Sequence, residues 1–132
     1  MLPFSVELKT GAPVSEQVIY AVKKAVISGH LQPGLKFPSV RVLSQELRIN
    51  PNTAHKIVSA LTQEGILEVQ PGIGTLVAPQ DRIATAQQRT DLLGTSVERL
   101  VVEARNLNLD LEDIQAAVGK QWNKLTRGGR KS

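Results

Sequence analysis

The sequence contains no cysteine, and this absence excludes several classes of protein at once. A disulfide scaffold, a thiolate metal site, an iron–sulfur cluster and a cysteine nucleophile all require that residue. Aromatic residues are scarce as well, at 3% of the 132 residues. The hydrophobic core must therefore be built from valine, leucine, isoleucine and alanine, which favours helices over a β-sandwich.

Long apolar runs are also missing. The first residues, Met1 to Glu7, lack the basic start and the apolar stretch of a signal peptide. No later segment approaches the length of a membrane-spanning helix, which needs about 20 apolar residues. We therefore expect a cytoplasmic protein with no membrane partner.

Positive charge is concentrated in one part of the chain. The formal net charge of the whole chain is +4, a value that many soluble domains tolerate. Between Lys23 and Lys56, however, six basic residues are opposed only by Glu46, which leaves a local surplus of five positive charges. On charge alone, this span is either a solvated basic face or a site for a polyanion.

Patterns in the first 65 residues predict one edge strand and three helices. Residues 4–8 alternate apolar and polar as a half-buried strand does, and residues 14–28 have helical spacing that ends at Gly29. Ser39 can cap a short helix over residues 40–47, and Asn50 with Pro51 can begin another that ends at Gly65. Two short helices joined by three residues predict a helix-turn-helix.

The rest of the chain predicts a hairpin and then two helices. Residues 66–70 and 75–78 read as strands around a turn rich in glycine, which would form a wing. From residue 80 onward apolar residues recur every three and four positions, interrupted by Gly94, as in a seam that packs against another helix. After a break at residues 106–110, Asp110 and Asp113 can start a second helix.

These elements predict a mainly α protein with a small β wing. Residues 1–79 would form a winged helix-turn-helix domain, residues 80–126 an α-helical dimerisation hairpin, and residues 127–132 a disordered basic tail. Two helices cannot bury the seam from Ile83 to Ala104 and the apolar stripe from Leu111 to Leu125 against each other and the wing alone, so we expect a homodimer. The alternative is that this segment completes the core of its own monomer. The residues assigned to the dimer interface are Ile83, Ala86, Leu93, Val97, Leu100, Ala104, Ile114, Val118 and Trp122.

The second helix of a helix-turn-helix enters the DNA major groove. Asn52 can form a bidentate pair with adenine, and Thr53 can hydrogen-bond a base or present its methyl group to thymine. His55 and Lys56 can donate to guanine or to phosphate. The expected partner is therefore a double-stranded DNA operator.

Neighbouring elements offer further contacts to DNA. Arg41 could reach a base or a backbone oxygen, and Ser39 with the free N–H groups at its helix start suits a phosphate. Gly72 and Gly74 at the wing tip permit a close approach to a narrow groove. Each of these residues also has a structural interpretation as a cap, a solvated side chain or turn geometry.

The order and spacing of these residues resemble the winged helix of GntR-type bacterial transcription regulators over about residues 13–79. The resemblance rests on Ser28–Arg41, Leu43, Asn50–Thr53, Leu61, Glu64–Ile66 and Gly72–Val77. The segment before the first helix, the Asn-Pro-Asn-Thr turn and the short two-helix tail resemble the YtrA subfamily. Members of that subfamily are dimeric repressors, often encoded beside transporter genes.

The resemblance carries expectations for individual residues. It implies that Arg41, Asn52, Thr53, His55 and Gly72 occupy DNA-contacting positions. The sequence also departs from the family pattern, because proline at position 51 and histidine at position 55 stand where many relatives have arginine. Valine residues at positions 40 and 42 replace the charged residues that usually flank the arginine of the first helix of the motif.

Two other functions compete with DNA binding. An enzyme is disfavoured, because the two histidines lie in different elements and no nucleophile triad, P-loop or zinc-protease motif occurs. We therefore expect no catalytic residue, no metal and no cofactor. The stronger alternative is a winged helix that assembles with a protein partner, although its recognition face lacks a large apolar anchor.

Regulation by a small molecule is left open by the sequence. Two short helices rarely enclose the ~300 Å³ or more that metabolite sites need. An effector could instead lie at the dimer interface near Trp122, whose indole N–H needs a partner if buried. Plain packing is the favoured interpretation of Trp122.

Overall fold

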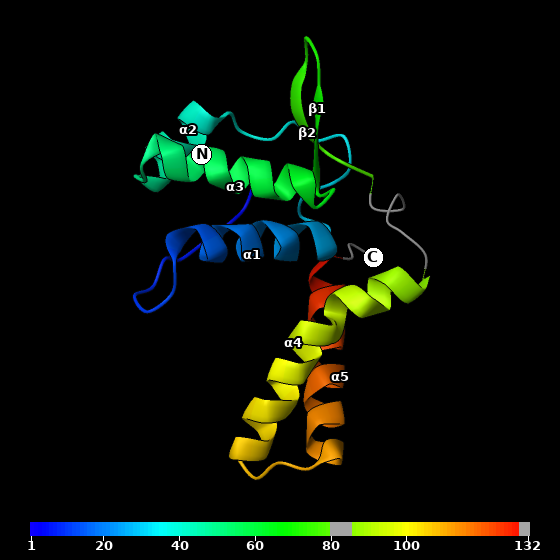
Figure 1. Cartoon of the computed structure of the whole chain (residues 1–132). Coiled ribbons are helices and arrows are strands. Elements are labelled where there is room, and N and C mark those ends of the chain that lie inside the picture. The colour runs from blue at the N-terminus through cyan, green and yellow to red at the C-terminus, as the bar shows by residue number, and fades with distance from the viewer. Residues whose placement is uncertain (80–85, 130–132) are drawn as a thin grey trace. The chain divides into compact units, whose positions relative to one another are not determined.

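The computed structural model describes residues 1–79 and 86–129, and their architecture is mainly helical with one small sheet (Figure 1). The predicted fold class is therefore confirmed. The chain divides into two compact units, the first made of Met1–Arg82 with Gly128–Ser132 and the second of Ile83–Arg127. In chain order the elements are α1 (Val14–Ile27), α2 (Val40–Leu47), α3 (Pro51–Gln63), β1 (Leu67–Gln70), β2 (Gly74–Val77), α4 (Ala86–Asn106) and α5 (Leu111–Gly129).

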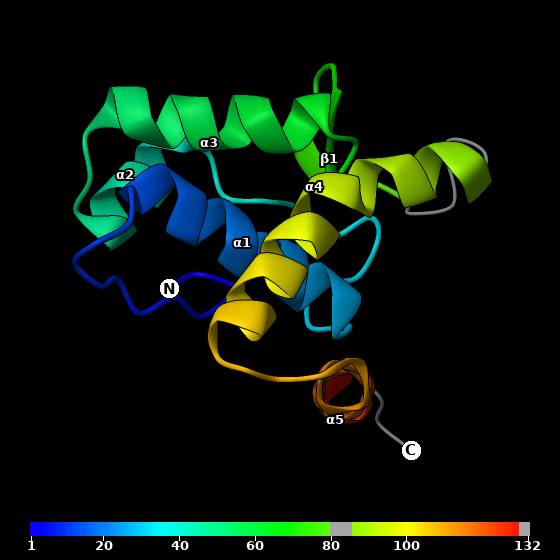
Figure 2. The same cartoon turned by 60° about the horizontal axis from the view of Figure 1, so that its bottom comes forward.

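The three helices of the first unit surround one apolar core. Both α1 and α2 pack against α3, and α3 also contacts β1. Figure 2 shows α1 and α3 side by side. The side chains that lose all or nearly all contact with solvent are Leu31, Leu43, Ile57, Leu61, Leu67, Val18, Val22 and Val77. Burial of each such side chain is favourable by about 1.5–3 kcal/mol, so this core fixes how the helices are arranged.

Local side-chain chemistry sets the start of both helices of the predicted helix-turn-helix. The Oγ of Ser39 accepts a hydrogen bond from the backbone N–H of Val42 at 3.2 Å. The Oδ1 of Asn50 accepts one from the backbone N–H of Asn52 at 2.7 Å, and Pro51 occupies the first turn. Both predicted caps are confirmed, and each contributes about 1 kcal/mol to helix stability.

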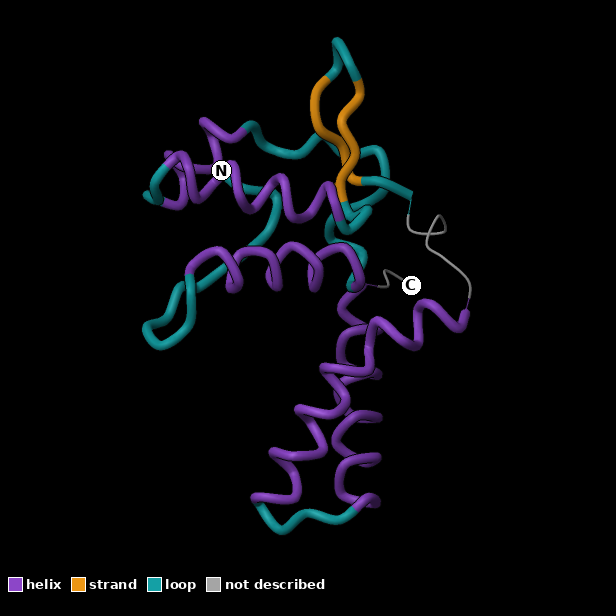
Figure 3. Tube along the Cα trace, viewed as in Figure 1, coloured by secondary structure: helices purple, strands orange, loops and turns teal. Residues whose placement is uncertain are grey.

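The predicted hairpin is present directly after α3. Strands β1 and β2 pair antiparallel with Leu67 opposite Val77 and Gln70 opposite Gly74, and Figure 3 shows them as a narrow projection. The tip uses positive backbone angles, with φ of 79° at Gly72 and 124° at Gly74. Only glycine adopts such angles at little cost, so the two glycines allow the tight turn.

The predicted strand over residues 4–8 is wrong. Phe4 is buried and its ring stacks on that of Phe37, with centroids 5.8 Å apart. Yet the segment is not a strand, because the free edge of β2 pairs instead with residues 34–37. At its end, the backbone N–H and C=O of Lys9 bond to the side chain of Gln17 rather than to another strand.

The second unit is a pair of helices joined by a short turn. Gly94 does not interrupt α4, which continues through it to Asn106. A reciprocal pair of hydrogen bonds between Asp110 and Asp113, at 3.0 and 2.9 Å, caps the start of α5 as predicted. Helix α5 continues to Gly129, so residues 127–129 of the segment predicted to be disordered are helical. Within the described residues, no helix has the length and apolar character needed to cross a membrane.

Candidate nucleic-acid interface

Helix α3 separates a buried apolar stripe from an exposed polar face. Ala54, Ile57 and Leu61 are completely buried against the rest of the first unit. Because a helix turns about 100° per residue, residues on the other side of α3 point to solvent, while Val58 packs partly against the core. The solvent side carries Asn52, His55, Lys56 and Ser59, which are exposed, and Thr53, which is half-buried. Polar donors and acceptors therefore project together from the helix that the motif assigns to the major groove.

Helix α2 adds a cation next to this helix. Arg41 lies in the first turn of α2 and is exposed. The hydroxyl of Ser39 accepts the capping hydrogen bond, so Ser39 has the structural role of a helix cap. Capping does not remove the remaining N–H groups of the first turn of α2, which face outward from the helix end. The helix start therefore keeps the donors that a phosphate requires.

The turn between α2 and α3 contains an uncommon backbone conformation. Arg48 ends α2 with φ of 55°, in the left-handed region. A residue with a Cβ atom pays about 1–2 kcal/mol for this conformation. Two backbone hydrogen bonds to the carbonyl of Ser44, from Arg48 and from Ile49, hold the turn closed. This conformation was not predictable from the sequence, because left-handed helix ends are usually marked by glycine or asparagine and position 48 is an arginine.

The eight residues predicted to contact DNA all lie in the first unit, although in different elements. Ser39 and Arg41 belong to the start of α2, four residues belong to α3, and Gly72 and Gly74 lie at the wing tip. All of them except Thr53 are exposed. Sequence reasoning counted Lys36 only within the basic surplus and overlooked its place beside the wing. The position of Lys36 is set by strand pairing with a segment distant in the sequence, and local sequence patterns do not indicate such pairing.

The second unit exposes many apolar side chains. Among the predicted interface residues, Leu93, Val97, Leu100, Val118 and Trp122 are exposed, and Trp122 is 72% exposed. Ile114 is half-buried, and Ala104 is already buried in the single chain. Ile83 and the side chain of Ala86 lie outside the described residues. Leu111, at the start of the predicted stripe, is also exposed, and the prediction did not include the exposed apolar residues Val101, Val102, Leu107 and Leu109.

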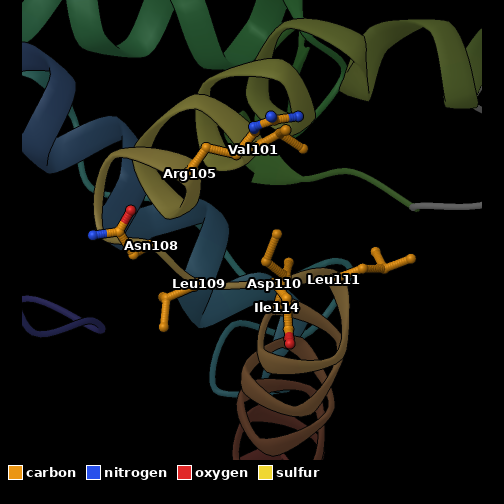
Figure 4. Close-up of a pocket in the computed structure, with 7 residues that line it drawn as sticks. All are labelled: Val101, Arg105, Asn108, Leu109, Asp110, Leu111 and Ile114. Atoms are coloured by element: carbon orange, nitrogen blue, oxygen red, sulfur yellow. The ribbon is translucent and has the colours of Figure 1, made fainter.

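A groove of about 480 Å³ lies where α4 turns into α5. Figure 4 shows Val101 and Arg105 on α4 and Leu111 and Ile114 on α5 around it. Trp122 is not among the lining residues, so this groove is separate from the place suggested for an effector. Within the described residues, no group of three or more histidine, aspartate or glutamate side chains could hold a metal ion.

Comparison with known proteins identifies the family of the first unit. Residues 14–77 match the family described as "Bacterial regulatory proteins, gntR family". These residues are a GntR-family helix-turn-helix domain. The match begins at the first residue of α1 and ends at the last residue of β2, so it covers the three helices and the wing.

Relatives of the GntR domain extend the similarity to the whole chain. The chain is 28% identical over 127 residues to the HTH-type transcriptional repressor YtrA of Bacillus subtilis, covering 96% of this chain and 97% of that protein. A crystal structure described as a transcriptional antiterminator from Listeria monocytogenes EGD-e superposes with a TM-score of 0.82 at 23% identity, over 98% and 96% of the two chains. YtrA from Sulfolobus acidocaldarius, a GntR-family transcription factor, superposes with a TM-score of 0.58 at 22% identity, over 91% and 97%. The chain is thus similar to GntR-type transcriptional regulators along its full length.

Proposed function

We propose that this GntR-type regulator is a homodimeric repressor that binds a pseudo-palindromic DNA operator by its sequence. The observation that carries the proposal is the polar solvent face of α3. Its amide, hydroxyl, imidazole and ammonium groups match the donors and acceptors of base edges and phosphates. The repressor assignment is supported by the similarity to the repressor YtrA of Bacillus subtilis.

Each element of the first unit has its own role in this proposal. Asn52 and His55 read base edges in the major groove. Lys56 on α3 and Arg41 on α2 bind phosphates or bases. The wing tip at Gly72 approaches the adjacent minor groove, where the absence of a side chain lets the backbone come close. Sequence preference then comes from α3, and general affinity comes from the surrounding cations.

The second unit supports the dimer. Leu93, Val97 and Leu100 are spaced four and three residues apart on α4, and all three are exposed in the single chain. Val118 and Trp122 form a matching exposed pair on α5. A soluble protein rarely leaves so many large apolar side chains in water, so a second copy of the chain is the partner that would cover them.

Assembly with a different protein is the competing function. A protein-binding face normally presents a large aromatic or aliphatic anchor that fills a pocket on its partner. The solvent face of α3 presents only polar side chains among the residues named above. This face therefore suits a polar nucleic-acid surface better than a protein surface.

The salt dependence of binding tests the proposal. If a dimer neutralises about six to eight phosphates, a plot of the logarithm of the association constant for a duplex against the logarithm of the salt concentration should have a slope of about −5 to −7. The slope is obtained by measuring the affinity for a labelled duplex by fluorescence anisotropy at salt concentrations from about 50 to about 300 mM. A flat response would show that phosphates are not bound and would favour the protein-assembly function.

A further inference from the structure

The wing of this protein has almost no charge of its own. Residues 66–78 contain one charged side chain, the acidic Glu68, and no lysine or arginine. Between its two glycines the tip carries Ile73, which is exposed. A wing that approaches DNA meets closely spaced phosphates, and cations are what make such an approach favourable. The hairpin itself therefore lacks a cation to bind the phosphates near its proposed position on DNA.

The connection between α1 and α2 supplies a third strand-like segment beside the wing. The backbone N–H of Phe37 donates to the carbonyl of Thr75 at 2.8 Å, and that of Val77 donates to the carbonyl of Leu35 at 2.9 Å. Between these bonds, Lys36 pairs with Leu76 in an antiparallel bridge. The segment is thus fixed to the outer edge of β2, although Lys36 and Leu76 lie 40 positions apart in the sequence.

This pairing places the side chain of Lys36 on one particular face of the wing. Paired residues of antiparallel strands project to the same face, and residues two apart on a strand share a face. Lys36, Leu76 and Gly74 therefore lie on the same side. A Cβ atom on residue 74 would lie 3.3 Å from the Cε atom of Lys36. The lysine stem consequently runs along β2 from the level of Leu76 toward the tip, over the space that glycine leaves open.

The ammonium group of Lys36 is free to meet a ligand. Lys36 is exposed. The ion pairs found among the described residues join the N-terminus to Glu46 and Lys23 to Glu64, and neither involves Lys36. A lysine ammonium is a compact charge with three donors, which binds a phosphate oxygen without reading the base next to it.

We propose that Lys36 is the phosphate-binding cation of the wing, contacting the DNA backbone beside the groove that the wing tip approaches. The inference rests on the proposed DNA-binding function and adds to it a residue outside both the helix-turn-helix and the hairpin. It also explains two features together, a wing without any lysine or arginine of its own and a glycine at position 74 beneath the lysine stem.

Two substitutions separate the charge of Lys36 from its packing. Lys36→Met keeps an unbranched apolar stem over Gly74 and removes the charge, whereas Lys36→Arg keeps the charge. The probe is a duplex selected from a random pool by the unchanged protein, compared with a scrambled duplex of the same length. We expect Lys36→Met to make the salt slope shallower by about 0.9 for each subunit. We expect it to weaken both duplexes by the same factor and Lys36→Arg to retain the slope.

Lys24→Met is the matched control. Lys24 is exposed on α1, on the side opposite its buried residues Val18, Val22 and Ala25, and its loss should leave the slope unchanged. The inference is overturned if Lys36→Met has the slope of the unchanged protein, if Lys24→Met lowers it equally, or if Lys36→Met weakens only the selected duplex. A flat slope for the unchanged protein would instead contradict the proposed function itself, so the two failures are distinguishable.

Discussion

Replacement of Leu100 by glutamate is expected to give a monomer that no longer binds its operator. Leu100 lies on α4 in line with Leu93 and Val97, and it is 41% exposed in the single chain. In a dimer that covers this stripe, the new carboxylate would be buried without a partner, at a cost of several kcal/mol. Sedimentation velocity should show the mass of one chain. Loss of the second half-site contact should weaken binding by a factor of about 10² or more.

Thr95→Glu is the control for the effect of an added charge. Thr95 is exposed and lies on the opposite side of α4 from the stripe, because residues 93 and 95 differ by about 200° around a helix. This variant should remain a dimer and keep its affinity for the operator. A Leu100→Glu protein that still sediments as a dimer would show that the interface lies elsewhere on the second unit.

Alanine at position 52 or 55 is expected to remove preference at particular base pairs. Asn52 and His55 project from the solvent face of α3, and neither is needed for the core. Loss of a well-placed contact to a base edge costs about 1–3 kcal/mol at the matched site and nothing at a site already mismatched there. Each variant should therefore tolerate substitutions of one base pair that the unchanged protein rejects. Competition binding with a set of single-base variants of the operator measures this change.

Lys56→Ala provides the comparison within the same helix. Lys56 is exposed beside His55, and a phosphate contact by its ammonium should weaken every sequence alike. If Asn52→Ala and His55→Ala also weaken all duplexes equally, α3 binds the backbone without reading bases. That result would leave a DNA-binding protein whose specificity comes from another element.

Local chemistry made the helix-turn-helix predictable from the sequence. The caps at Ser39 and Asn50 and the proline at position 51 act on backbone groups within three residues of themselves. The glycines at positions 29 and 72 mark positive φ angles in the same direct way. Helix periodicity then located the buried face of α3, because the apolar residues recur on one side. The residues left over on the other side became the candidate DNA contacts.

Features that depend on distant partners were not predictable in this way. The alternation around Phe4 reports burial correctly at that residue, but a strand also needs a partner with a free edge. That edge of β2 is taken by residues 34–37, which local patterns describe only as an irregular connection. The same pairing determines where Lys36 lies. At the other end of the chain, glycines at positions 128 and 129 did not stop α5, because each glycine costs a helix only about 1 kcal/mol.

Selection of duplexes from a random pool shows whether two copies of the chain read a symmetric DNA site. Paired recognition helices about 34 Å apart would meet successive major grooves on one side of the duplex. The enriched sequences should therefore contain two inverted half-sites with centres about 10 base pairs apart. The Leu100→Glu protein should fail to enrich them. Enrichment of a single unpaired half-site by the unchanged protein would contradict symmetric binding by a dimer, and no enrichment of any sequence would contradict sequence-specific DNA binding.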